Sequence, residues 1–197
     1  MKKYYGKSPL NEITRNQIIR RSKQESPDRF AKITNFFRQK DFASVNFVKL
    51  FEDDEFVWTA QVGDYDVTIS FEGAFQNLHD YVRSWTGKNR IKRINVKLLS
   101  QCLTKSLDTE DLYMDCECPD FKYRFAYHLT QAGGKYGKPQ NNRPTVRNVK
   151  NNKGFVCKHI LSLLHGKRWV PAAAKMWLEY IKANPELSAE YIWEYYR

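Results

Sequence analysis

Apolar and polar residues alternate in two adjacent stretches near the middle of the chain. In residues 56–62 the apolar side chains fall at every second position, and the alternation returns in residues 65–71 with a clean polar face. Gly63-Asp64 separates the two stretches, and a two-residue turn led by glycine is typical of a β-hairpin. The pattern predicts two antiparallel strands with one apolar face.

Apolar residues at helical spacing occur on both sides of this hairpin. Ser26-Pro27-Asp28 combines an N-cap residue, a proline at the first helical position and an acid in the first turn, so a helix is expected there. The predicted helices cover residues 27–39, 75–85, 96–107, 160–164, 171–183 and 188–196. The last is dense in aromatic residues, which either close the core or form a sticky face for another chain.

These elements predict an α+β fold, in which a small antiparallel sheet packs with several helices. The 197 residues suit one medium domain with appendages, and 15% aromatic residues can supply a substantial core. Four segments are expected: a basic N-terminal arm and helix, a core of hairpin plus helices, a metal-binding module with an insert, and a helical C-terminal segment. Their bounds are 1–40, 41–111, 112–165 and 166–197.

The net charge of +11 is concentrated in two segments. Residues 1–40 carry 11 Lys or Arg against 3 Asp or Glu, and residues 119–156 carry 8 against 1. Residues 1–25 have no apolar period, which predicts an extended or partly helical arm that needs a partner to become ordered. The short basic cluster 88–93 is either a solvated connector or a phosphate-contact strip. Such segregated charge indicates contact with polyanions or with acidic protein surfaces.

Neither a run of about 18 apolar residues nor an apolar signal segment is present, so we expect a cytoplasmic protein without a membrane anchor. Three of the four cysteines belong to one pattern, which favours a reducing compartment over a disulfide framework. The fourth, Cys102, lies in an apolar helical stretch and is expected to be a small buried hydrophobic residue.

Cys116, Cys118, Cys157 and His159 form the pattern Cys-x-Cys followed, after a long gap, by Cys-x-His. Three thiolates and one imidazole suit a tetrahedral Zn²⁺ ion, and four protein ligands indicate a structural site. Residues 112–118 are expected to form a strand that presents both sulfurs on one side, and residues after Cys157 to start a helix, giving a ββα knuckle. The alternatives are buried cysteines without a metal, or His128 as a rival ligand.

This arrangement resembles the SWIM-type zinc finger, with the same four residues at the ligand positions. Cys118-Pro119-Asp120-Phe121 and Cys157-Lys158-His159-Ile160 are similar to that family's flanking sequences. The resemblance covers residues 112–165, and the 38 residues between Cys118 and Cys157 are a longer gap than is usual in the family. The chain also looks like long-insert SWIM proteins of large tailed phages, including crAss-like ones, which implies a component of the virion made in the host cytoplasm.

The insert between the two ligand pairs interleaves aromatic and basic residues in 121–127, a combination that suits single-stranded nucleic acid. Phe121, Phe125 and Leu129 also recur at helical spacing, so some of these rings are expected in the core. The candidate contact residues for nucleic acid or another partner are the basic ones, Lys122, Arg124, Lys135, Lys138, Arg143, Arg147, Lys150 and Lys153.

Catalysis has little support in the sequence, which lacks a Gly-rich phosphate loop, an apolar-flanked carboxylate pair and an evident nucleophile with its base. Two non-enzymatic hypotheses follow. In the first, a zinc-stabilised structural protein docks on other subunits of a large assembly through its basic arm and insert. In the second, the same segments bind DNA or RNA phosphates without strong sequence specificity. Neither hypothesis requires a small-molecule substrate.

Overall fold

A computed structural model describes residues 13–27, 30, 31, 33, 45–46, 55–83, 93–144 and 156–185. The predicted helix 188–196, residues 88–92 of the basic cluster and residues 1–12 of the arm lie outside the described residues. Of the predicted helix 27–39, the described residues Pro27, Phe30, Ala31 and Ile33 are helical.

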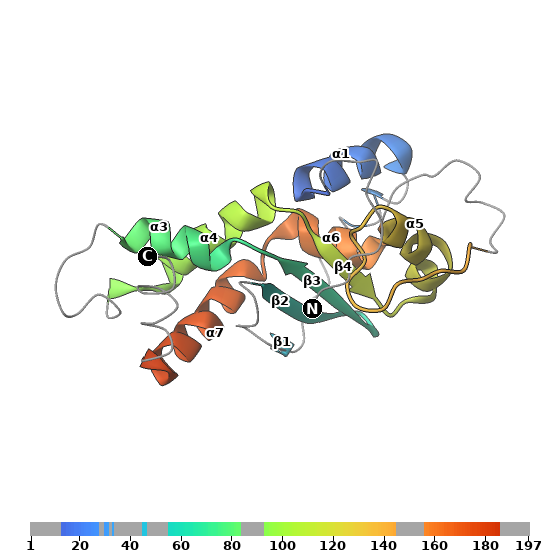
Figure 1. Cartoon of the computed structure of the whole chain (residues 1–197). Helices are drawn as coiled ribbons and strands as arrows, with labels where there is room; N and C mark the ends of the chain where they lie inside the picture. The colour runs from blue at the N-terminus through green and yellow to red at the C-terminus, as the bar shows by residue number, and fades with distance from the viewer. Residues whose placement is uncertain are drawn as a thin grey trace.

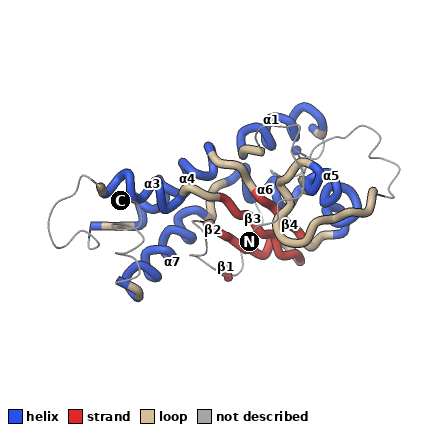
Figure 2. Tube along the Cα trace, viewed as in Figure 1, coloured by secondary structure: helices blue, strands red, loops and turns tan. Residues whose placement is uncertain are grey.

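The described elements form an α+β fold, as the sequence predicts (Figures 1 and 2). The strands are β1 (Val45–Asn46), β2 (Phe56–Val62), β3 (Tyr65–Phe71) and β4 (Tyr113–Cys116). The α-helices are α1 (Arg15–Glu25), α3 (Ala74–Val82), α4 (Val96–Thr109), α5 (Ala126–Gln131), α6 (Lys158–Gly166) and α7 (Val170–Ala183). A π-helix, η2 (Phe121–Phe125), leads directly into α5.

The sheet has the order β1-β2-β3-β4, and all neighbouring strands run antiparallel. The predicted hairpin is confirmed: Val62 pairs with Tyr65, and Gly63 takes a positive φ of 63° at the first turn position. Only glycine adopts this conformation without strain, which is why the turn is led by that residue. On the polar face, the hydroxyls of Thr59 and Thr68 lie 3.0 Å apart across the strand pair.

The apolar face of the sheet packs against helices, mainly through large aromatic side chains. An aromatic cluster forms where the ring of Trp177 from α7 lies 5.9 Å from Phe56 and 4.9 Å from Phe75, and Phe56 stacks on Phe71 at 5.2 Å. These four rings are almost completely buried. Helix α7 also packs along α4, and α3 packs on α4 (Figure 1). Fully burying such side chains stabilises the fold by about 1.5–3 kcal/mol each.

Helix α1 is part of this body, whereas the sequence indicates only an extended or partly helical arm at residues 1–25. Thr14 caps the helix by accepting a hydrogen bond from the backbone N–H of Gln17, at 3.5 Å. Ile18 and Ser22 are buried, and α1 packs against α4 and α6. The sequence shows no apolar period here because one of the two buried positions of α1 is occupied by a polar residue, Ser22.

Arg15 fastens α1 to two other helices. Its guanidinium donates hydrogen bonds to the backbone carbonyls of Leu164 and His165 at the C-terminal end of α6. It also pairs with the carboxylate of Asp108 near the end of α4, at 2.9 Å, and Lys167 reaches the other oxygen of that carboxylate at 2.5 Å. A cation beside the last carbonyls of a helix also complements the helix dipole.

Within the described ranges, none of the helices has the length and apolar character needed to cross a membrane.

Candidate metal centre

The first ligand pair lies where β4 ends and the chain turns into η2. Cys116 is the last residue of β4 and pairs with Val67 of β3, so its side chain lies on the buried face of the sheet. The strand was predicted to continue through Cys118, but it ends two residues earlier. Pro119 is already helical, and Cys118 occupies the turn before it.

Cys118 acts as a cap for the helical segment that follows it. The backbone N–H of Phe121 donates a hydrogen bond to the Cys118 sulfur at 3.3 Å, the position that an N-cap side chain usually satisfies. The N–H of Cys118 in turn donates to the Cys116 sulfur at 3.5 Å. Both hydrogen bonds place positive charge beside a sulfur atom, which stabilises a thiolate.

The second ligand pair belongs to the start of α6. Cys157 is the N-cap residue, and His159 lies in the first turn. The predicted short apolar helix is confirmed, since Ile160, Leu161, Leu163 and Leu164 are all buried. This apolar side fixes α6 against the sheet and so presents the pair to the end of β4. The N-terminal end of the helix dipole also favours a thiolate at Cys157.

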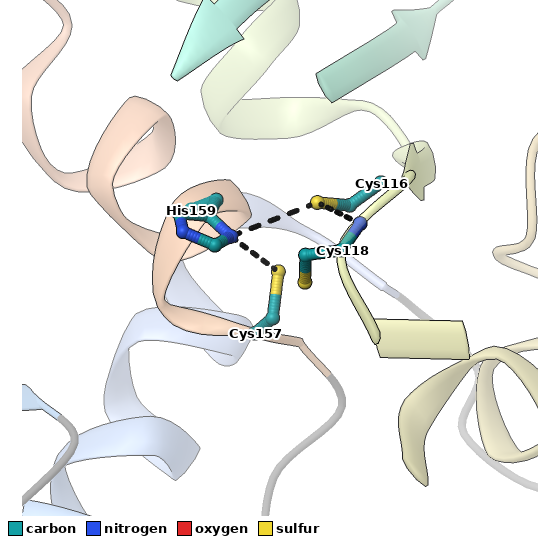
Figure 3. A group of neighbouring side chains, drawn as sticks. All are labelled: Cys116, Cys118, Cys157 and His159. Carbon is teal, nitrogen blue, oxygen red and sulfur yellow. Dashed lines mark hydrogen bonds between the residues drawn. The ribbon is translucent and has the colours of Figure 1, made fainter. Parts of the chain in front are cut away.

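The structure brings all four predicted ligands together, and their ligand atoms all lie within 4.8 Å of one another. The Nδ1 atom of His159 is 3.9 Å from the Cys116 sulfur and 4.0 Å from the Cys157 sulfur (Figure 3). A tetrahedral site with metal–ligand bonds of about 2.0–2.3 Å has edges of roughly 3.5–3.8 Å. The four side chains are therefore close to the spacing that one metal ion requires, and the group could hold a metal ion.

Hydrogen bonding among the sulfurs separates the pKa values of the three thiols. Hydrogen bonds from Cys116, Cys157 and His159 lower the pKa of Cys118 well below its ordinary value. The hydrogen bond with Cys118 raises the pKa of Cys116 to about 12, and burial raises that of Cys157. The side chains alone favour one thiolate, whereas a bound cation stabilises the others as well.

The other residues that the sequence raised as ligands have different surroundings. His128 lies on α5, outside the ligand cluster, with its ring 5.4 Å from Tyr127. Cys102 is fully buried in α4, and burial raises the pKa of its thiol to about 12, so the prediction of a small hydrophobic role is confirmed. Within the part of the chain that the structure describes, the four-residue cluster is the only group of three or more His, Cys, Asp or Glu arranged to hold a metal.

The first part of the insert is folded onto the sheet. Phe121, Phe125 and Leu129 are buried, which confirms that their helical spacing places these side chains in the core. After α5 the chain returns beside β4: the N–H of Met114 donates to the carbonyl of Gly134 at 2.8 Å, and the N–H of Tyr136 donates to the carbonyl of Met114 at 3.0 Å. The described part of the insert therefore adds a single parallel bridge, between Met114 and Lys135, to the β4 edge of the sheet.

The candidate contact residues of the insert differ in their exposure. Lys122, Lys138 and Arg143 are exposed. Arg124 forms an ion pair with Asp120 at 3.2 Å, one helical turn away. The side chain of Lys135 is only 9% exposed and lies 3.0 Å from the Asp115 carboxylate, so its charge is engaged within the fold. Arg147, Lys150 and Lys153 lie outside the described residues.

Tyr123 is a surface residue within the aromatic and basic stretch 121–127, although only the basic residues of the insert were named as contact candidates. Its side chain is 62% exposed, although its neighbours Phe121 and Phe125 are buried. The signal was present in the sequence, because two residues that recur at i and i+4 leave the residue between them on the opposite face of a helix.

Searches against protein-family models, curated proteins and solved structures find no match to this chain. The assignment of the metal centre therefore rests on the geometry and chemistry of its four side chains.

Proposed function

We propose that this protein is a non-enzymatic, zinc-stabilised structural component of a larger assembly, in which the metal holds a basic insert in one shape for neighbouring subunits to contact. The observation that carries the proposal is the buried cluster Cys116, Cys118, Cys157 and His159, which joins the two ends of the insert.

Zinc is the metal that best suits this cluster. Three sulfurs and one imidazole nitrogen are the donors of a Cys₃His structural site, and Zn²⁺ accepts them in tetrahedral geometry. All four positions are supplied by protein, and even His159 is only 5% exposed. A site of this kind leaves no position for a substrate or an activated water, which supports a structural role rather than a catalytic one.

The order Cys-x-Cys, insert, Cys-x-His and the placement of the pairs at a strand end and a helix start support a SWIM-type finger. The resemblance to long-insert SWIM proteins of tailed phages suggests a virion as the assembly. Exposed cations on two elements are available for docking: Arg20 and Lys23 on α1, and Lys138 and Arg143 on the insert. They match acidic surfaces on neighbouring subunits.

The test is to isolate the tagged full-length chain from the cells that naturally make it and to sediment it on a gradient. The proposal predicts a fast-sedimenting complex that survives nuclease treatment. The charge-reversing variant Lys138→Glu/Arg143→Glu should be absent from the fast-sedimenting complex. The control variant Lys175→Glu, which changes another exposed lysine on α7, should still be present in it. Sedimentation of the natural chain as a free monomer would contradict the assembly function.

Binding to DNA or RNA is a second candidate function, and one observation favours it: the exposed ring of Tyr123 lies beside the exposed cation Lys122. Such a function predicts micromolar affinity for nonspecific nucleic acid that falls steeply with salt, because each phosphate contact releases counterions. Absence of binding at about 50 mM salt would favour protein docking instead. In the gradient experiment, loss of the fast complex on nuclease treatment would favour the nucleic-acid function.

A further inference from the structure

Tyr123 is the most exposed large hydrophobic side chain among the described residues. Within those residues only two large hydrophobic side chains are exposed, Tyr81 at 46% and Tyr123 at 62%. Docking through an apolar surface requires several such residues, and the described surface lacks such a cluster, so the protein docking proposed above depends on charge. A single exposed ring in a cationic setting instead fits a partner that presents both planar groups and negative charge.

The backbone under Tyr123 is held on both sides. Phe121 and Phe125, two residues before and two residues after it, are buried in the core. At the start of η2, the backbone N–H groups of Phe121 and Lys122 donate to the carbonyl of Cys118, at 3.0 and 3.1 Å. The metal centre is thus the base from which Tyr123 projects. A ring on a rigid base loses little conformational entropy when a partner stacks on it.

The π-helical geometry of η2 is itself informative. A π-helix contains one more residue per hydrogen-bonded turn than an α-helix, and such turns occur frequently at functional sites. Within η2, Phe121 and Phe125 are buried, whereas the consecutive residues Lys122 and Tyr123 are exposed. An irregular turn therefore carries an exposed aromatic ring and an exposed cation at consecutive positions.

The segment that carries Tyr123 is rich in basic residues. In residues 119–144 there are five Lys or Arg and one acid, Asp120, which is paired with Arg124. The loop that carries Lys138 and Arg143 is tied to α5 by the hydrogen bond from the N–H of Gln140 to the Thr130 hydroxyl, at 2.9 Å. The loop and α5 lie at the same end of the molecule (Figure 1). Exposed cations thus precede α5 in the chain, at Lys122, and follow it, at Lys138 and Arg143.

From these observations we infer that Tyr123 is a stacking platform for a base of single-stranded nucleic acid, with Lys122, Lys138 and Arg143 contacting the phosphates. The inference rests on the second candidate function and names its substrate class. Duplex DNA does not offer an unstacked base face, whereas every base of a single strand does. Stacking on Tyr123 is consequently expected to occur with any base, so that binding does not depend on the nucleotide sequence.

The experiment compares the zinc-loaded full-length chain with its Tyr123→Ala variant in binding to a 30-nucleotide oligo-dT and to a random duplex of equal length. Fluorescence anisotropy across a salt series gives both the affinity and its salt slope. Stacking on one ring predicts that Tyr123→Ala weakens oligo-dT binding by roughly 5-fold or more, with an unchanged salt slope and unchanged duplex affinity. Tyr123→Trp should retain the affinity.

Two controls separate stacking from other effects. Tyr81→Ala removes the other exposed tyrosine and should not change oligo-dT binding. Lys122→Ala should lower the salt slope by about 0.7, the value of one single-strand phosphate contact, and weaken oligo-dT and duplex alike. The zinc content and melting temperature of each variant are measured to check that the metal centre and the fold are intact.

Each failure has a distinct meaning. If the natural chain binds oligo-dT and duplex equally and Tyr123→Ala binds like it, the platform is overturned while phosphate contact stands. If the natural chain binds neither at about 50 mM salt, both the platform and the nucleic-acid function are overturned. Loss of the fast-sedimenting, nuclease-resistant complex in Tyr123→Ala, without oligonucleotide binding by the natural chain, would also overturn the inference and assign the ring to protein docking.

Discussion

The aromatic end and the metal end of this molecule keep their shapes by different means. At the aromatic end, α3, α4 and α7 bury large rings such as Phe75 and Trp177 against the apolar face of the sheet. At the metal end, the last residues of β4 and the first turn of α6 present four ligand atoms within 4.8 Å. The aromatic end depends on buried apolar area, whereas the metal end combines buried apolar area with four ligand atoms placed for one metal ion.

The difference follows from how the elements at each end are connected along the chain. Helix α7 has 14 residues, and its residue Trp177 alone contacts both α3 and the sheet. The segments η2 and α5 together span 11 residues. Joining the two ligand pairs also closes a loop of 38 residues, which is entropically unfavourable without a strong link. A metal ion supplies that link between the end of β4 and the start of α6, in addition to the apolar side chains buried around it.

The largest effect is expected from removing a ligand at the metal end. Cys116→Ala should abolish stoichiometric zinc binding and lower the free energy of unfolding by several kcal/mol, since structural zinc contributes about 10–16 kcal/mol in small zinc-finger peptides. Metal analysis and hydrogen exchange would test this, with protection lost first in η2, α5 and the start of α6. Cys102→Ala is the matched control, because Cys102 is buried but remote from the ligand cluster, and it should keep its zinc. An unchanged melting curve after chelation would contradict a structural metal.

The next largest effect is expected from opening a cavity at the aromatic end. Trp177→Ala removes the ring that contacts both Phe56 and Phe75, and large-to-small changes of this kind cost about 3–5 kcal/mol. Because the metal ligands are untouched, the folded fraction of this variant should still bind one zinc per chain. Denaturant titration and metal analysis check the two statements separately. If Trp177→Ala also loses its zinc while folded, the two ends are not held independently.

Two glycines in the insert sharpen the comparison at the metal end, because each is required for a different reason. A Cβ on Gly134 would lie 2.8 Å from Ile13 Cδ1 and 3.2 Å from the carbonyl oxygen of Leu112, whereas a Cβ on Gly137 would meet nothing within 4 Å. Gly134→Ala should therefore cost about 1–3 kcal/mol through overpacking.

Gly137 has a positive φ of 72°, so Gly137→Ala should cost only about 1–2 kcal/mol of backbone strain. Urea titration of the two variants measures both costs. The hydrogen-exchange protection of the Met114 N–H should fall in Gly134→Ala only, because this N–H donates its hydrogen bond to the carbonyl of Gly134. Equal effects of the two substitutions on Met114 would show that the close packing of Gly134 does not hold the segment.

The parts of the fold that the sequence predicts are those encoded by regular periodicity. Alternation gives β2 and β3, and helical spacing gives α4 within two residues of its observed end at Thr109. The return segment at Gly134 forms a single parallel bridge, which is too short to leave an alternating pattern. The π-helix is also absent from the pattern, because Phe121 and Phe125 at i and i+4 would share one face of an α-helix as well.

The metal ligands were predictable for another reason. Cysteine and histidine at close pair spacing carry their chemistry in their side chains, so the ligand set did not depend on knowing the strand boundary that was placed two residues too late. Exposure of Tyr123, in contrast, depends on which face of η2 is buried. Residue type therefore identified the metal centre and the aromatic and basic stretch 121–127, whereas the structure was needed to show that Tyr123 is the most exposed ring of that stretch.

The smallest effect concerns pH and the contact between α1 and α6. Burial, together with the charges of Lys23 and Arg15, lowers the pKa of His165 below its ordinary value. The unfolded chain therefore binds this proton more tightly than the folded chain does. The associated stability is fully present above about pH 6.5 and is lost as the pH falls from there through the lowered pKa of the folded state.

His165→Gln should consequently show a smaller decrease in unfolding free energy between pH 7.5 and pH 5.5 than the natural chain. Acid also protonates the metal ligands, but this contribution is common to both chains and cancels in their difference. An NMR titration of the His165 ring in the folded protein measures the lowered pKa directly. Identical pH profiles for the two chains would show that His165 does not contribute to the pH dependence of the free energy of unfolding. The acid sensitivity would then be assigned to protonation of the metal ligands.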